Sequence, residues 1–183
     1  LDKKHCGGID DGVDHVDRGE TDDVIIEDKK SKIISFVDLA GHEQYLKTTI
    51  SGITSSYPDY SIVCVEKNIT KITKEHIGIL VHMGIPFILL FNKIDLIPAH
   101  VINRNIEILT KIINKYKKKM VKLNHEDWDT NEILKPDNIN NIVPYMLISN
   151  KTGENLDKLI EMLEKIPIRK KIISKGFTVD NIY

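Results

Sequence analysis

Three residues in the first quarter of the chain have the types and spacing of a phosphate-sensing loop. The apolar run 33–37 is followed by Asp38, Gly41 and His42. A carboxylate at the end of a strand can hold Mg²⁺ through water, and a glycine lets a phosphate approach a bare backbone N–H. The imidazole that follows is placed to orient an attacking water. This order predicts a site that responds to the terminal phosphate of a nucleotide.

A second motif has the chemistry to read a guanine base. The apolar run 86–91 is followed by Asn92, Lys93 and Asp95. The Asp95 carboxylate can accept two N–H groups from guanine, the Lys93 stem can pack over the base, and Asn92 can tie the loop to its neighbours. Adenine presents the opposite hydrogen-bonding pattern, so such a site can favour guanine over adenine by roughly 10⁴-fold.

A third motif follows the apolar run 143–148 and includes Ser149 and Asn150. A backbone N–H and the Ser149 hydroxyl can contact the guanine oxygen and brace Asp95. Each of the three motifs follows a predicted strand, and ligands bind at the carboxyl ends of strands in open α/β sheets. The alternative is three unrelated loops in which Asp and Asn serve as turn formers.

With these motifs, the chain resembles a translational GTPase, and more narrowly the elongation-factor-like family of GTP-binding proteins 1 and 2. The resemblance rests on residues 38–49 (DLAGHEQYLKTT) and 149–156 (SNKTGENL), and it extends from about Gly19 to the C-terminus. Most elongation factors have proline at the position of Ala40. The resemblance implies GTP and Mg²⁺ as cofactors. It also implies roles for individual residues: Asp38 for Mg²⁺, Gly41 for the γ-phosphate, His42 for the catalytic water, Asn92, Lys93 and Asp95 for guanine, and Ser149 and Asn150 in support.

Thr21 carries a further implication of the resemblance. Residues 19–21 (GET) resemble a family segment whose threonine closes over Mg²⁺ and the γ-phosphate in the GTP state. Thr21 is therefore expected to be a second metal ligand beside Asp38. The alternative is that Thr21 caps a helix or strand in a polar loop.

The family's phosphate-binding loop, G-x-x-x-x-G-K-[ST], does not occur in the chain, and only twenty residues precede Thr21. Hydrogen bonds to charged groups contribute about 1.5–3 kcal/mol each, so losing several weakens binding by roughly three to six orders of magnitude. The strand before that loop would lie between residues 33–37 and 61–65, which are left with unpaired edges. Two explanations stay open: a fragment of a working GTPase, or a degenerate relative that serves as a nucleotide-free scaffold.

Strands that alternate with helices predict an α/β fold with a doubly wound, mostly parallel sheet and helices on both faces. The resemblance makes it a P-loop NTPase-type sheet that lacks its first strand and phosphate loop. Residues 1–22 are expected to be a mobile switch-like segment, 23–168 the GTPase core, and 169–183 a linker into a β-barrel domain. The expected strands are 24–27, 33–38, 61–66, 86–91 and 143–148. The expected helices are 43–52, 73–82, about 98–116, and one from Leu156 that ends near Pro167.

Two polar stretches have less specific interpretations. Lysines cluster between residues 115 and 122, which indicates a solvated helix end or, alternatively, a contact with ribosomal RNA. Residues 124–141 are predicted to be a polar surface insertion that contains Trp128.

The composition limits the classes of partner that this chain is expected to bind. The chain has 183 residues, 41% of them hydrophobic, and a formal net charge of −1, so no global positive field favours DNA or a membrane. No apolar stretch approaches 18 residues, and two isolated cysteines, Cys6 and Cys64, suggest reduced thiols in the cytoplasm. The expected partners are a guanine nucleotide and, by resemblance, the ribosome, tRNA or other RNA-associated machinery.

Overall fold

The computed structural model describes residues 23–26, 32–123 and 135–169. The chain divides into two compact units, Leu1–Asp38 and Leu39–Tyr183. The elements in chain order are β1 (Asp23–Ile26), β2 (Lys32–Ser35), η1 (Glu43–Tyr45), α1 (Leu46–Ser56), β3 (Ser61–Val65), α2 (Lys71–His82), β4 (Phe87–Phe91), α3 (Ala99–Lys115), β5 (Lys119–Lys122), α5 (Pro136–Ile139), β6 (Ile142–Leu147) and α6 (Leu156–Lys165). No helix among these residues is long and apolar enough to cross a bilayer.

The first unit contains an antiparallel pair of strands, β1 and β2, whose register sets Asp23 opposite Ser35. Both strands were predicted, but the expected run of the second strand to Asp38 was wrong. Strand β2 ends at Ser35 because β1, its partner, begins opposite at Asp23. Residues 36–38 continue outside the ladder, and Asp38 is exposed.

The second unit is built on a four-stranded sheet of order β3-β4-β6-β5, in which every pairing is parallel. Strand β4 is central, and all five of its residues are buried. Its register sets Phe91 beside Val65 of β3 and Leu147 of β6, so these three strands end level with one another. The predicted α/β architecture with a parallel sheet is confirmed.

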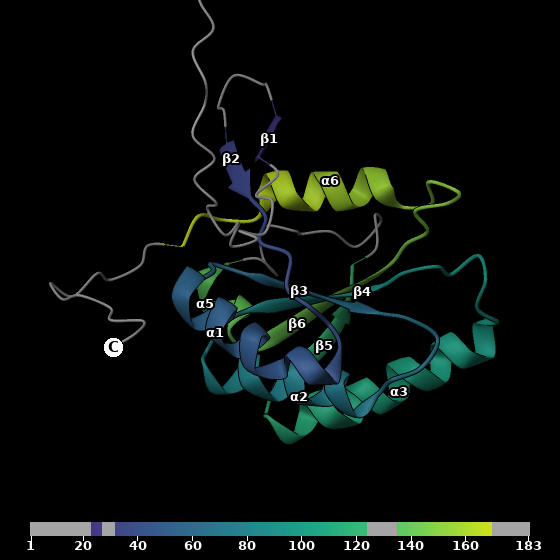
Figure 1. Cartoon of the computed structure of the whole chain (residues 1–183). Coiled ribbons are helices and arrows are strands. Elements are labelled where there is room, and N and C mark those ends of the chain that lie inside the picture. Colours follow the sequence, from purple (N-terminus) through teal and green to yellow (C-terminus); the bar gives the residue numbers. More distant parts are fainter. Residues whose placement is uncertain (1–22, 27–31, 124–134, 170–183) are drawn as a thin grey trace, which may run out of the picture. The chain divides into compact units, whose positions relative to one another are not determined.

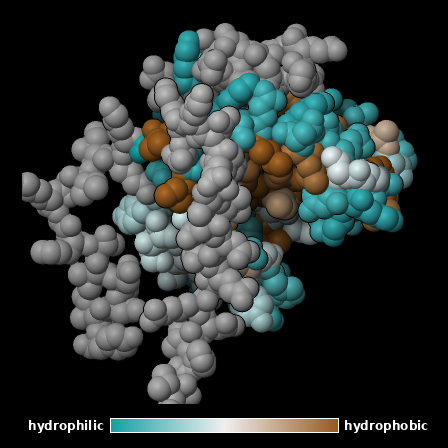
Figure 2. Space-filling view, turned by 90° about the horizontal axis from the view of Figure 1, so that it is seen from above, coloured by the Kyte–Doolittle hydropathy of each residue, from teal (hydrophilic) through white to brown (hydrophobic). Residues whose placement is uncertain are grey.

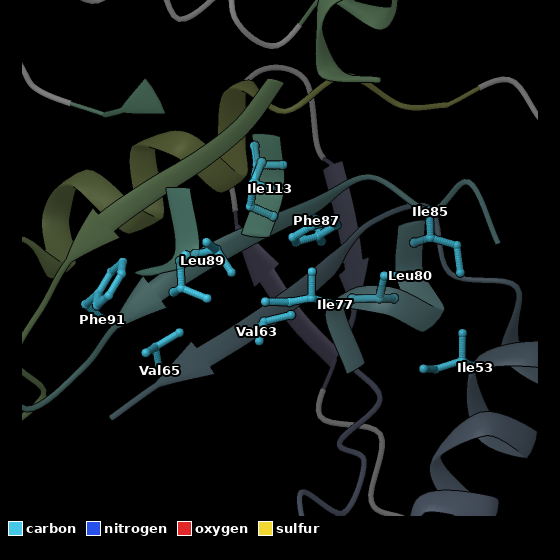
Figure 3. Close-up of a cluster of buried hydrophobic side chains, with 12 residues drawn as sticks. Ile53, Val63, Val65, Ile77, Leu80, Ile85, Phe87, Leu89, Phe91 and Ile113 are labelled. Atoms are coloured by element: carbon cyan, nitrogen blue, oxygen red, sulfur yellow. The ribbon is translucent and has the colours of Figure 1, made fainter. Parts of the chain in front are cut away.

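Successive β4 residues point to opposite faces of the sheet, and each face has its own core. Figure 1 shows α1, α2 and α3 on one side of the sheet and α6 on the other. Figure 3 shows the first core, where β4 side chains meet Ile77 and Leu80 of α2 and Ile113 of α3. On the second face, Ile88 and Leu90 pack with Met162 of α6. The expectation of helices on both faces is therefore correct.

The α6 side of the molecule is not uniformly polar. Figure 2 looks down on this side and shows hydrophilic residues with apolar residues exposed between them. On α6 itself, Met162 is fully buried, whereas Ile160 is 51% exposed. The helix therefore buries only one stripe against the sheet, as expected for an amphipathic surface helix.

Two helix boundaries differ from the prediction. The helix predicted from Thr73 begins at Lys71, because the side chain of Thr70 caps it by accepting the Thr73 N–H at 3.3 Å. The helix predicted to end at Gly52 continues to Ser56. Gly52 is tolerated there because it makes room for Leu39: a Cβ at residue 52 would lie 2.6 Å from the Leu39 side chain.

Strand β5 was not predicted. Its residues belong to the lysine cluster, and Lys119 and Lys122 are exposed while Met120 and Val121 are half-buried. The cluster is thus partly an edge strand, where lysines discourage pairing with other chains. The predicted insertion 124–141 includes helix α5, whose Ile139 is 2% exposed and belongs to the core. Residues 124–134 lie outside the described residues.

His76 on α2 has a polar side chain whose burial disfavours its charged form. Its Nε2 atom is buried and has no hydrogen-bond partner in the described part of the chain. This burial lowers the pKa of His76 below its usual value, and the nearby Glu75 opposes the shift only in part. Protonation of the folded protein is therefore disfavoured at this site.

We expect His76 to make the protein less stable in mild acid. Because its pKa is lower in the folded than in the unfolded state, the unfolded chain binds the proton first as pH falls below about 6.5. The free energy of unfolding should therefore fall between about pH 7 and pH 5, and His76→Leu should reduce this dependence. Urea unfolding at several pH values measures it. His82→Leu, at an exposed position of the same helix, is the matched control, and an equal effect of both variants would contradict the assignment.

Candidate nucleotide-binding site

The loop after β4 is fixed by backbone pairing on both sides. The Asn92 N–H donates to the Val65 carbonyl at 3.1 Å, which extends the pairing with β3 by one residue. The Ile94 N–H donates to the Ile148 carbonyl at 3.4 Å, which joins the loop to the end of β6. Asn92 Oδ1 accepts the Lys93 N–H at 2.7 Å, and Lys93 has a positive φ of 60°. A local side-chain bond thus helps to hold an unusual backbone turn.

Asp95 and Ser149 come from different loops and meet at this edge of the sheet. Ser149 Oγ donates to Asp95 Oδ1 at 2.6 Å, although 54 residues separate the two in the chain. Ser149 is fully buried, whereas Asp95 is exposed. One carboxylate oxygen is therefore held by a rigid group, and the carboxylate stays open to a ligand on its exposed side.

The loop after β6 holds Ser149 through several bonds of its own. Ser149 Oγ also accepts the Thr152 N–H at 3.2 Å, and its carbonyl accepts the Gly153 N–H at 2.9 Å. Gly153 has a φ of 80°, a conformation that favours glycine. Asn150 lies in the same turn and is exposed. The Ser149 hydroxyl therefore both organises its own loop and orients Asp95.

Asn155 closes this loop, and the sequence motifs did not single it out. Its Nδ2 donates to the Leu147 carbonyl at 2.8 Å, and its Oδ1 accepts from Lys158 Nζ at 2.8 Å. Its φ of 60° is the left-handed conformation that asparagine tolerates better than most residues. Its sequence signal was its place in the run 149–156 (SNKTGENL), on which the family resemblance partly rests.

Glu66 and Asn105 are two further residues that the motifs missed. Glu66 Oε1 lies 2.5 Å from Lys93 Nζ, so a carboxylate from the end of β3 pairs with the lysine of the guanine motif. Asn105 on α3 is 5% exposed and donates to the Lys67 carbonyl at 2.9 Å and the Glu66 carbonyl at 3.4 Å. The sequence around these residues does not predict either contact, because each joins residues more than 25 positions apart in the chain.

The segment that carries Gly41 is anchored to α1. Thr49 is 4% exposed, and its hydroxyl donates to the Ala40 carbonyl at 2.7 Å. A Cβ added to Gly41 would meet no atom within 4 Å, so the space beside this glycine is open. A phosphate can therefore approach its backbone. Asp38 ends the first unit and Gly41 lies in the second, so their mutual spacing stays a prediction from the sequence.

His42 caps the short helix η1 in this structure. Its Nδ1 accepts the Gln44 N–H at 3.3 Å, and its ring lies edge-on to Tyr45 with centroids 6.2 Å apart. An Nδ1 that accepts a hydrogen bond leaves the neutral ring protonated at Nε2. In this arrangement Nε2 is a donor, so it can hold a water oxygen but cannot take a proton from water.

The oxygen groups expected to bind Mg²⁺ suit that ion chemically. Mg²⁺ prefers carboxylate, hydroxyl, phosphate and water oxygens, and it is commonly held by one or two protein ligands plus phosphates. Asp38 is an exposed carboxylate, and Thr21 lies outside the described residues. The described residues contain no cluster of three His, Cys, Asp or Glu side chains that could hold a metal by themselves.

Sequence comparison identifies a protein family and two relatives that this chain resembles. Residues 9–167 match the family described as the elongation factor Tu GTP-binding domain. GTP-binding protein 1 of Xenopus laevis is 34% identical over 163 residues, which are 85% of this chain and 25% of that protein. GTP-binding protein 2 of Homo sapiens is 33% identical over 145 residues, covering 76% and 24% of the two chains. The chain thus spans about a quarter of the length of these relatives.

Solved structures of translation factors share the fold. Elongation factor SelB of Methanococcus maripaludis, in complex with the GTP analogue GPPNHP, superposes with a TM-score of 0.58 and 23% identity over 85% of this chain and 30% of SelB. The bacterial selenocysteine-specific elongation factor EF-Sec gives a TM-score of 0.57 and 20% identity, covering 80% and 22% of the two chains. The family match covers most of the chain, and the fold agrees with it. The chain therefore belongs to the elongation factor Tu GTP-binding domain family.

Proposed function

We propose that this chain forms the guanine-recognising part of a GTPase switch of the translation-factor class. The observation that supports this most directly is the bond of 2.6 Å between Ser149 and Asp95, at the level carboxyl ends of β4 and β6. A carboxylate oriented in this way can accept both N–H groups on the Watson–Crick edge of guanine. Adenine offers no such pair of donors, so the site is selective by chemistry and not only by shape.

The proposed hydrolysis uses the second group of residues. Asp38 and Thr21 would hold Mg²⁺, which would supply positive charge to neutralise the phosphates of bound GTP. The Gly41 backbone N–H contacts the γ-phosphate, and His42 orients the water for in-line attack. Because the His42 Nδ1 accepts from Gln44, His42 must leave this cap or change tautomer before it can accept a proton from water. Hydrolysis then releases the loop of Thr21 and helix α1.

The proposed hydrolysis needs a phosphate-binding loop, and these 183 residues do not contain one. The intact guanine and γ-phosphate motifs favour a fragment of a working GTPase over a degenerate relative. The alternative function is a scaffold that binds translation partners without nucleotide. DNA upstream of the codon for Leu1 that encodes G-x-x-x-x-G-K-[ST] would favour the fragment.

Family membership also guides the proposal for partners. The solved neighbours are elongation factors, so we propose that the ribosome or tRNA machinery stimulates the switch, in the cytoplasm. Isolated switch domains of related kinds hydrolyse GTP at about 10⁻⁴ to 10⁻² per second, which is why a stimulating partner is expected.

Guanosine and adenosine test the base site on this chain directly, because they bind without phosphates. We expect guanosine to bind more tightly than adenosine, and Asp95→Asn to lower guanosine affinity by at least about tenfold through loss of a charged hydrogen bond. The same variant should improve binding of xanthosine, whose carbonyl at position 2 can accept from the Asn amide. Saturation-transfer NMR titrations with the three nucleosides measure these affinities.

Asp157→Asn, at an exposed position in the first turn of α6, is the control for loss of one carboxylate. Equal binding of guanosine and adenosine by the unmodified chain would contradict the proposed function. Binding of Mg-GTP at affinities typical of complete GTPase domains would instead contradict the expected cost of lacking the phosphate loop.

His42→Ala tests the proposed catalytic role in the longer protein that includes the phosphate loop. Turnover of GTP should fall by about 10²-fold or more, because a group that positions or deprotonates water typically contributes this much. Affinity for GTP should change little, because the imidazole is not expected to hold the ground-state nucleotide. Single-turnover hydrolysis and a separate binding titration distinguish the two effects. Unchanged turnover would assign His42 to the helix cap alone.

A further inference from the structure

We propose that Glu66 is a positioning residue for guanine recognition and that it acts through Lys93. This inference rests on the proposed function. The Glu66 carboxylate lies 2.5 Å from the Lys93 ammonium, yet Glu66 is outside the three nucleotide motifs. It follows β3 directly, and Val65 is level with Phe91 of β4, so Glu66 and Asn92 face each other at the edge of the sheet.

The backbone that carries Glu66 is held from two sides. The Val65 carbonyl accepts the Asn92 N–H at 3.1 Å. On the other side, the buried Asn105 donates to the carbonyls of Glu66 and Lys67 at 3.4 and 2.9 Å. A buried amide that bonds to two successive carbonyls restrains the chain at this point. The Glu66 carboxylate therefore starts from a fixed backbone.

The lysine, in contrast, is fixed only at its backbone. Asn92 holds the Lys93 N–H, and the positive φ sets the direction of the side chain. Four rotatable bonds then separate the backbone from the ammonium, and ordering such a side chain costs up to about 2 kcal/mol of entropy. By pairing with the ammonium before a base arrives, Glu66 limits where the aliphatic stem can lie. The stem is the part of Lys93 that is expected to cover the base.

The solvent exposure of the Lys93–Glu66 ion pair limits how strongly Glu66 can change the affinity for guanine. The side chains of Lys93 and Glu66 are 51% and 61% exposed, so solvent screens their attraction. An exposed ion pair of this kind corresponds to no more than about a fivefold change in an equilibrium constant. Glu66 is therefore expected to tune the affinity for guanine without determining which base is bound.

The test uses the full 183-residue chain with guanosine as the probe. Glu66→Gln should weaken guanosine binding about three- to fivefold and leave the preference over adenosine unchanged. Lys93→Met keeps the aliphatic stem but removes the charge. In that background, Glu66→Gln should have no further effect, because Glu66 acts only through the ammonium. Added salt should lower the affinity of the unmodified chain toward that of Glu66→Gln.

Glu107→Gln, an exposed carboxylate on α3, is the matched control and should bind guanosine like the unmodified chain. Thermal unfolding of each variant identifies a loss of folding. Guanosine binding that is unchanged by Glu66→Gln would overturn the inference, and so would a loss that persists undiminished in the Lys93→Met background. Failure of the unmodified chain to prefer guanosine over adenosine would overturn the proposed function itself, which distinguishes the two failures.

Discussion

The central strand β4 is the constraint on which the site depends. All five of its residues are buried, and they alternate between the two cores of the sheet. A shift of one residue in its pairing would exchange the side chains on the two faces, so burial fixes the register. That register aligns the ends of β3, β4 and β6. The positions of Glu66, Asn92 and Ser149 are consequences of core packing and need no ligand.

The polar groups near the carboxyl ends of β3, β4 and β6 range from buried to exposed. Ser149 and Asn105 are buried and satisfied by hydrogen bonds to neighbouring loops. Asp95 and Lys93 are exposed, but each contacts a group with a fixed backbone. Buried hydrogen bonds are costly to break because the groups left behind are unsatisfied. The rigid inner layer therefore restrains the positions of the outer groups, which are the ones proposed to contact the base.

The sequence was most informative where local pattern and tertiary structure agree. The uninterrupted apolar run of β4 predicted a buried strand, and all five of its residues are buried. That ligands bind at the end of this strand stays a prediction. Strand β5 was missed because half of its residues are lysines, which local pattern assigns to a solvated helix end. The contacts of Glu66 and Asn105 could not be predicted either, because they depend on which strands become neighbours. Thr49 is similar: its bond to Ala40 exists only because α1 folds back beside that loop.

The two halves of the proposed nucleotide site differ in what they need from a ligand. The guanine half is organised by Ser149, Asp95 and the strand ends within one compact unit. In the γ-phosphate half, Gly41 has open space beside it and His42 has its Nδ1 engaged as a helix cap. A cap of this kind lies at the surface and is a weak interaction that bound phosphate and water can replace. In the proposed site, the groups assigned to the base are therefore already held by the fold, whereas His42 would have to leave its cap when nucleotide binds.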